Sequence, residues 1–169
     1  MEVAIIRVTS MSVSIVVLFC SIYIVNAISG GFLIQMGSLN SEMFRLEGQW
    51  WRVFTSSFFH DNIIHLAGNC LALYFVGLLV EQKIGKSIFL LTFLISNTIE
   101  RIIFVYLFDV VMSVGSSPGI FGLYGVILVC CYYQKEYYTR IKGSRELPYL
   151  IGYTIAGSVF FIESYRDFL

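Results

Sequence analysis

The chain has 169 residues, of which 57% are hydrophobic, 17% aromatic and only 13% charged, and its mean hydropathy is +0.80. This composition excludes a soluble enzyme, because soluble domains carry about 25% charged residues. The 11 basic and 11 acidic residues give no net positive field, so we expect no nucleic-acid partner. The length allows one domain, whose partners are met in the lipid bilayer.

Five apolar runs are long enough to cross a membrane as helices. A spanning helix needs about 20 apolar residues, because the hydrocarbon layer is about 30 Å thick. The first run is too long for a signal peptide and is interpreted as a permanent anchor. The sequence therefore predicts an all-α, polytopic membrane bundle of five transmembrane helices. The runs cover residues 11–34, 63–82, 87–108, 116–134 and 148–165.

Lysine and arginine residues are unevenly distributed between the two sides of this bundle. The N-terminus and the second and fourth loops carry seven of them, and the other side carries three. By the positive-inside rule the N-terminus is cytoplasmic. No transit-peptide composition is present, so we expect a bacterial cell membrane. The cytoplasmic set is Arg7, Lys83, Lys86, Lys135, Arg140, Lys142 and Arg145, and the outer set is Arg45, Arg52 and Arg166.

The first loop, residues 35–62, is too aromatic for a solvated linker. Its rings belong to Phe44, Trp50, Trp51, Phe54, Phe58 and Phe59. Aromatic side chains gather where the membrane meets water, so the loop is predicted to lie at the interface beside the bundle. An aromatic belt that only anchors the protein explains the composition equally well.

His65 and Asn69 are polar residues inside the second run, where polar groups are costly and point to function. Four residues apart, they share one helical face near its outer end. They could donate two hydrogen bonds to one oxyanion, or simply bridge packed helices. His60 and His65 do not lie on one helical face, so no metal site is expected. The four cysteines lie in apolar runs and predict no disulfide.

The segment that opens the fourth run combines glycine, serine and proline. At 100° per residue, Gly115, Gly119 and Gly122 form one stripe, and Ser117 lies on nearly the opposite face. The stripe favours close packing against a neighbouring helix. Pro118 suits the first helical position, which makes Ser117 the predicted N-cap. A serine at a helix N-terminus is either a cap alone or a nucleophile whose oxyanion product the free N–H groups stabilise.

These motifs occur together and in order. The sequence contains Trp51-Arg52, His60-x4-His65-x3-Asn69, Gly77-x3-Glu81 and Gly115-x-Ser117. The joint pattern, over roughly residues 45–130, resembles the rhomboid family of intramembrane serine proteases. The resemblance implies a single rhomboid-like transmembrane domain over residues 1–169.

The resemblance also implies a role for each matching residue. Ser117 matches the nucleophile, which attacks a peptide bond in or near a transmembrane segment of another membrane protein. His65 and Asn69 match the residues that stabilise the oxyanion together with the serine backbone N–H. Trp51 and Arg52 match a structural motif of the first loop, and the glycine stripe has a structural role. The resemblance implies no cofactor and no metal.

The catalytic base is where the match fails. In rhomboids a histidine of a sixth span, followed by glycines, accepts the serine proton. This sequence has two histidines, both near the second span, and five apolar runs. The domain is therefore expected to be truncated at its C-terminus, and its glycine stripe to lack a packing partner. Lys135 lies about 27 Å along the fourth helix from Ser117 at 1.5 Å per residue, so it cannot serve instead.

Two smaller departures concern single positions. Pro118 stands where the family usually has glycine. Glu100 and Arg101 stand in the third run where the family usually has small residues. Neighbouring helical residues point about 100° apart, so these two are not expected to neutralise each other. They are expected to pair with other polar groups of the bundle.

Three functions remain open on this basis. The first is a rhomboid serine protease whose activity is impaired by the missing base. The second is a non-proteolytic rhomboid-like protein that binds transmembrane helices. The third is a small structural or channel-forming subunit, favoured by Glu100 and Arg101 alone. The sequence predicts neither the substrate nor the oligomeric state.

Overall fold

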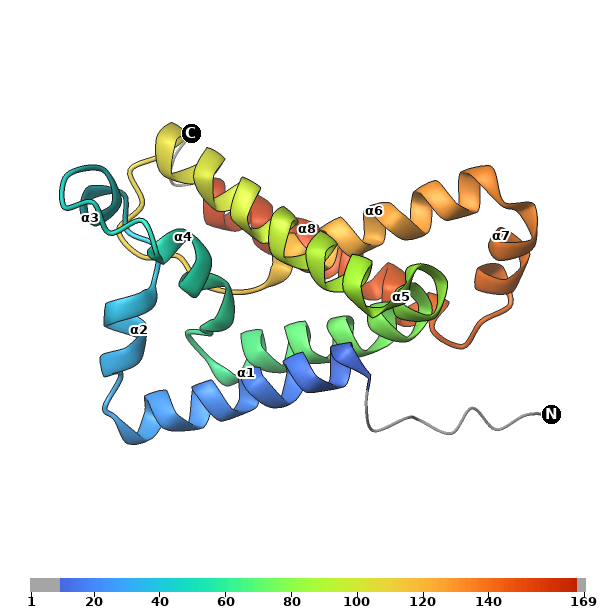
Figure 1. Ribbon diagram of the computed structural model, residues 1–169, viewed down its shortest axis with the longest axis horizontal. Coiled ribbons are helices and arrows are strands. Elements are labelled where there is room, and N and C mark those ends of the chain that lie inside the picture. Colours follow the sequence, from blue (N-terminus) through green and yellow to red (C-terminus); the bar gives the residue numbers. More distant parts are fainter. Residues whose placement is uncertain (1–9, 167–169) are drawn as a thin grey trace.

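The computed structural model describes the backbone of residues 10–166 and the side chains of residues 10–157, so Arg7 and the Arg166 side chain lie outside it. Over this range the chain is helical, with an isolated bridge between Leu39 and Ser113 and no strand (Figure 1). The predicted all-α class is confirmed. The elements are α1 Met11–Ile28, α2 Phe32–Gly37, α3 Ser41–Arg45, α4 Arg52–Thr55, the 3-10 turn η1 Ser56–Phe58, α5 Ile63–Leu107, α6 Ser117–Tyr133, α7 Lys135–Lys142 and α8 Leu147–Arg166.

The long helices follow the predicted apolar runs. Among the described residues, α1 and α5 are long and apolar enough to cross a membrane, and α6 with α7, bent by 120°, is a third candidate. α5 has 45 residues and is interrupted at Gly85, whose φ of 78° and ψ of 163° are not helical. Its two halves coincide with the second and third predicted runs. The count of five spans stays a prediction.

The first predicted run was too long. α1 ends at Ile28, and the chain turns through Gly30 and Gly31, with φ of 67° and 86°, before α2 begins. Glycine adopts positive φ without steric cost, so the chain can turn here although the hydrophobic run continues. α2 therefore leaves α1 at a steep angle and leads into the first loop (Figure 1).

α1 is fixed to the first half of α5 by the Gly-x3-Glu motif. The Glu81 carboxylate accepts hydrogen bonds from the Met11 N–H at 2.9 Å and the Ser10 hydroxyl at 2.7 Å. It thereby satisfies donors that the start of a helix leaves free. One turn away, a Cβ on Gly77 would overlap the Ser12 side chain. The motif thus sets how closely these two helices approach.

α6 packs Gly119 and Gly122 of the glycine stripe against the second half of α5, and Gly115 faces the first half. A Cβ added to Gly119 would lie 2.7 Å from the Phe93 carbonyl oxygen, and one added to Gly122 would overlap Ser96. The expectation that this stripe lacks a partner was therefore wrong. Small residues let two helix backbones approach closely in a membrane, where no hydrophobic force drives helices together.

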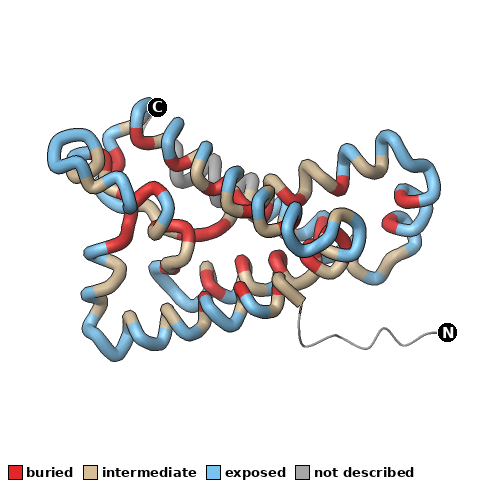
Figure 2. Tube along the Cα trace, in the orientation of Figure 1, coloured by how far each residue is buried: buried red, intermediate tan, exposed pale blue. Residues whose placement is uncertain are grey.

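Buried positions line the inner faces of the helices, and the outer faces are exposed (Figure 2). The largest fully buried side chains include Phe19 of α1 and Phe89 and Phe93 of α5. The exposed face of the second half of α5 is itself apolar, with Ile88, Leu91, Ile95 and Ile99 more than half exposed. An apolar outer surface is what a lipid-facing helix requires.

Replacing Gly119 with alanine is expected to destabilise the protein by about 1–3 kcal/mol, because the added methyl group would meet fixed backbone of α5. The matched control is Gly125→Ala on the same helix, where nothing lies within 4 Å of the added methyl. That change is expected to be neutral, or stabilising by up to about 1 kcal/mol, because alanine favours the helix. Thermal unfolding in one detergent measures both, and equal midpoints would contradict the packing.

Candidate active site

Ser117 is the first residue of α6 and is half-buried. The prediction that it is the N-cap was wrong by one position, because Ser116 occupies the cap and Pro118 is the second helical residue. Ser116 makes no side-chain capping bond, and its hydroxyl is buried without a partner. The Ser117 hydroxyl therefore does not serve as the cap of α6.

Arg101 holds the loop that leads into this serine. Its guanidinium donates to the Gly115 carbonyl at 2.7 Å and to the Ser113 hydroxyl at 2.6 Å. Gly115 has a φ of 109°, and its N–H donates to the Ser56 carbonyl at 3.1 Å. Glu100 lies 3.5 Å from Arg101 Nε, so these neighbours do pair, contrary to the expectation. Arg101 also meets other polar groups, as expected, and it fixes the backbone two residues before Ser117.

Asn97 fixes the first turn of α6 from the same face of α5, one turn before Arg101. Its side-chain oxygen accepts the Gly119 N–H at 3.0 Å. The first N–H groups of a helix have no partner inside the helix. Pro118 has no N–H to donate. Of the N–H groups in the first turn of α6, that of Ser117 makes no hydrogen bond within the described residues.

His65 and Asn69 lie on α5 directly beside this loop. A Cβ on Gly115 would lie 2.5 Å from His65 Nε2 and 3.7 Å from Asn69 Nδ2. The structure therefore brings both predicted residues to the turn that carries Ser117. Asn69 Nδ2 is buried and makes no hydrogen bond in the described part of the chain. It is an unused donor directed at the start of α6.

Two residues that the sequence analysis missed orient this pair. Asp61 Oδ1 lies 2.7 Å from His65 Nδ1, and the Tyr153 hydroxyl of α8 donates to Asn69 Oδ1 at 2.8 Å. Asp61 precedes His65 by four residues, a spacing that would have indicated the contact. Nothing in the spacing relates Tyr153 to Asn69, since 84 residues separate them.

His60 lies beside His65 with its ring buried between helices. Its ring centroid is 5.1 Å from that of His65 and 5.1 Å from that of Phe19. Burial lowers the pKa of His60 to about 3, so this ring is neutral at physiological pH. Burial alone would raise the pKa of the Asp61 carboxyl, but the hydrogen bond and charge of His65, together with hydrogen bonds from the Asp61 backbone and Asn62, outweigh burial and lower it. Asp61 is thus an ionised partner for His65.

Arg52 joins separate parts of the first loop. It is buried, and its guanidinium donates to the Ser38 carbonyl at 2.8 Å and to the Gln35 carbonyl at 3.0 Å. Trp51, by contrast, is 40% exposed and packs edge-on against Trp50. Arg52 therefore holds the loop together from inside while the indoles face outward.

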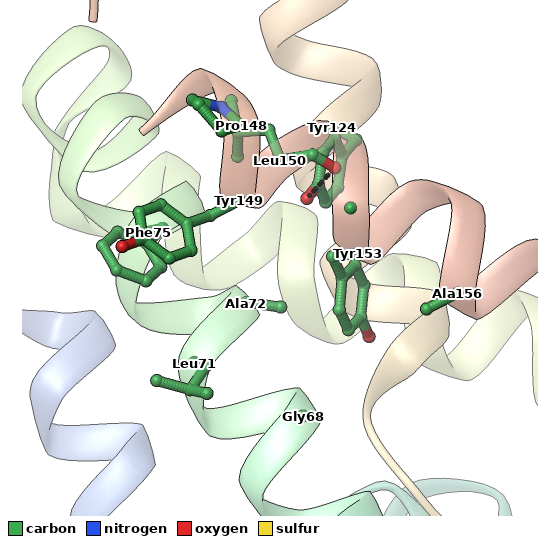
Figure 3. A pocket seen from close by; sticks show the side chains of 11 residues that line it. Gly68, Leu71, Ala72, Phe75, Tyr124, Pro148, Tyr149, Leu150, Tyr153 and Ala156 are labelled. Carbon is green, nitrogen blue, oxygen red and sulfur yellow. Dashed lines mark hydrogen bonds between the residues drawn. The ribbon is translucent and has the colours of Figure 1, made fainter. Parts of the chain in front are cut away.

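A groove of about 310 Å³ separates α8 from the first half of α5, and Figure 3 shows the side chains along it. Phe75 and Tyr149 stack at 4.3 Å between ring centroids. The walls of the groove carry two pairs of small residues that are four residues apart. These are Gly68 with Ala72 on α5 and Gly152 with Ala156 on α8. Tyr153 also lines the groove, so the same side chain contacts both the groove and Asn69.

Comparisons with known proteins agree with these motifs. The family model described as the rhomboid domain matches residues 47–165. The chain is 33% identical over 119 residues to rhomboid protease GluP of Bacillus subtilis (strain 168), covering 70% of this chain and 23% of that protein.

Two plant proteins are also similar. RHOMBOID-like protein 2 of Arabidopsis thaliana is 36% identical over 95 residues, covering 56% of this chain and 30% of that protein. Inactive RHOMBOID-like protein 8 of the same plant is 29% identical over 100 residues, covering 59% of this chain and 28% of that protein. The chain thus spans less than a third of each of these three relatives. The chain has helices long and apolar enough to span a bilayer, and the family model matches well over half of its length. The chain is therefore an integral membrane protein that belongs to the rhomboid family.

Proposed function

We propose that the chain is a rhomboid-type intramembrane serine protease that cleaves transmembrane segments of membrane proteins, with Ser117 as the nucleophile. The observation that carries the proposal is the convergence of His65 and Asn69 on Gly115, two residues before the serine. Hydrogen-bond donors that surround a nucleophile stabilise the negative charge that develops on the attacked carbonyl oxygen.

Three donors are proposed for this oxyanion. They are the Ser117 N–H, Asn69 Nδ2 and the imidazole of His65. The Tyr153 hydroxyl occupies Asn69 Oδ1, which directs the amide nitrogen of Asn69 toward the start of α6. A buried donor without a partner costs about 1–3 kcal/mol, so the arrangement favours an anionic or carbonyl ligand at this point.

The remaining predicted residues have supporting roles in this proposal. Arg52 fixes the first loop from inside, Trp51 lies on its outer side, and Gly115, Gly119 and Gly122 let α6 approach α5. The proposal treats residues 1–169 as a single rhomboid-like domain in a bacterial cell membrane, with the N-terminus cytoplasmic and Ser117 in the outer half. No cofactor takes part.

A serine hydroxyl needs a base to become a good nucleophile, and a positioned base contributes about 10² to 10⁴ in rate. The two histidines of the 169 residues, His60 and His65, both lie beside the first half of α5. His60 is neutral and buried, and His65 lies against Gly115, two residues before the serine.

A fluorescent alkylphosphonate is expected to label the wild-type protein at Ser117 when the protein is purified in bilayers. Ser117→Ala is expected to abolish the label, because phosphonates react with the nucleophilic oxygen. Ser116→Ala is the matched control and keeps the label, since the neighbouring hydroxyl has no hydrogen-bond partner to lose. Equal labelling of wild type and Ser117→Ala would exclude Ser117 as the nucleophile.

A second candidate is a non-proteolytic protein that binds transmembrane helices. The groove between α5 and α8 favours it, because small residues four apart on both walls are typical of close helix packing in membranes. A third helix with a similar small-residue face could lie there without cleavage. The channel hypothesis loses its support, since Arg101 is engaged with the loop before Ser117.

Helix binding is expected to survive Ser117→Ala and to fail when the groove is filled. Nothing lies within 4 Å of a Cβ added at Gly152, which lines the groove, so a leucine there is expected to extend into the groove. Gly125→Leu is the matched control, with equally open surroundings on α6 outside the groove. Photocrosslinking to a transmembrane model peptide in liposomes measures capture. If Gly152→Leu and Gly125→Leu capture the peptide equally, the groove is not the binding site.

A further inference from the structure

Exposed basic residues gather at the end of the bundle opposite Ser117. Helix α6 carries the chain from Ser117 to Tyr133, which is about 25 Å at 1.5 Å per residue. Six exposed lysines and arginines lie at that far end, in the turn of α5 around Gly85 and in the segment from α7 to the start of α8. They are Lys83, Lys86, Lys135, Arg140, Lys142 and Arg145, and together they form what we call the basic end.

Helix α7 lies across this end instead of continuing α6. It is bent by 120° from α6, and its residues Tyr137 and Ile141 are buried. These two residues are four apart, so they share one face, and the other residues of α7 are exposed. A charged outer face is costly in the hydrocarbon layer, so α7 lies at the boundary between the membrane and water.

Contacts across one seam join α7 to the end of the first half of α5. The Tyr137 hydroxyl donates to the Leu79 carbonyl at 3.4 Å, and Arg140 donates to the Gln82 side-chain oxygen at 3.0 Å. Lys83 Nζ lies 5.3 Å from the centre of the Tyr137 ring. Lys83 and Arg140 therefore lie along this seam, and each is held by a residue on the opposite helix.

Acidic residues do not neutralise the seam. The ion pairs of the described residues involve neither Lys83 nor Arg140. The nearest acidic residue along α5, Glu81, accepts hydrogen bonds from Ser10 and Met11 at the start of α1. Two cations that share a seam and have no acidic partner within the described residues attract an anion.

The other end of the bundle, which carries α3 (Figure 1), has the opposite balance of charge. Its described loops expose four acidic residues and one basic residue, which are Glu42, Glu47, Asp61, Asp109 and Arg45. The chain as a whole has a formal net charge of zero, so the attraction for an anion comes from the arrangement of the charges. An anion that approaches the bundle is therefore drawn to the basic end.

Tyrosines indicate the depth of the basic end in the bilayer. Tyr132 and Tyr133 end α6, Tyr138 lies on α7, and all three side chains are exposed. Tyrosine gathers at the level of the lipid headgroups, because its ring is apolar and its hydroxyl needs water. The neighbouring lysines and arginines lie at the same level, where the phosphates of the lipids are. This depth favours a lipid over a soluble anion as the ligand.

We propose that the seam binds the phosphate of an anionic phospholipid, with Lys83 and Arg140 as the two cations that contact it. The bond to Gln82 uses one N–H donor of the Arg140 guanidinium and leaves others for phosphate oxygens. Lys135 and Lys142 attract anionic lipid to the neighbourhood of the seam. A zwitterionic headgroup binds more weakly, because its own cation would face the same two side chains. This lipid site is independent of the proposed catalytic activity.

Native mass spectrometry of the full chain in detergent measures the binding directly. Phosphatidylglycerol is the anionic probe, and phosphatidylcholine with the same acyl chains is the zwitterionic control. We expect phosphatidylglycerol to bind about tenfold more tightly, because each basic residue near a phosphate favours the anionic lipid. Raising the concentration of ammonium acetate is expected to reduce this difference. Equal affinities for the two lipids would overturn the inference.

Paired substitutions test whether the seam itself is the site. Lys83→Gln combined with Arg140→Gln is expected to lower the affinity for phosphatidylglycerol by about tenfold and to leave that for phosphatidylcholine unchanged. The matched control is Lys135→Gln combined with Lys142→Gln, which removes the same charge from α7 outside the seam. We expect this control to lower the affinity by about threefold or less. Equal losses in the two double variants would overturn the assignment to the seam.

A charge-preserving pair separates recognition of charge from damage to the fold. Lys83→Arg combined with Arg140→Lys is expected to retain the preference for phosphatidylglycerol, because both cations remain at the seam. A loss as large as that of the glutamine pair would overturn the role assigned to charge.

Glycerol phosphate separates a lipid site from a site for a soluble anion, because it carries the phosphate without acyl chains. We expect it not to displace phosphatidylglycerol when the two are present at equal concentration. Displacement under these conditions would overturn the assignment of a lipid as the ligand.

Discussion

The structure depends on the close contact between α6 and the second half of α5. Gly119 and Gly122 remove the side chains that would keep the two backbones apart. Asn97 then reaches the Gly119 N–H, and Arg101 reaches the Gly115 carbonyl. In lipid no hydrophobic force brings helices together, so packing and such hydrogen bonds decide how they meet. These two polar residues, one turn apart, set where Ser117 lies.

The break at Gly85 brings the two sides of the site together. The stretch of α5 before Gly85 begins at Ile63, and the stretch after it ends at Leu107. Each stretch holds 22 residues and is therefore about 33 Å long at 1.5 Å per residue. Because the second stretch returns over the length of the first, residues near both ends of α5 meet at the same end of the bundle. His65 and Asn69 thus face the loop that Arg101 holds.

Much of the fold and the site could be predicted from the sequence, because apolar length and residue spacing are local signals. Such local signals predicted the helical runs, the shared face of His65 and Asn69, and the glycine stripe. The end of α1 and the cap of α6 were misjudged, since glycine turns and serine pairs shift a boundary without changing hydrophobicity. The bond from Tyr153 to Asn69 joins residues 84 apart and depends on tertiary packing, which no local pattern reveals.

The two proposed functions share one residue, since Tyr153 lines the groove and also donates to Asn69. Ser117, His65 and Asn69 are proposed to form one site around the oxyanion. An experimental structure of the phosphonate adduct tests it most directly. We expect phosphorus bonded to Ser117 Oγ, with the phosphonyl oxygen within hydrogen-bond distance of His65 Nε2 and Asn69 Nδ2. An adduct on another residue, or a phosphonyl oxygen directed away from both side chains, would contradict it.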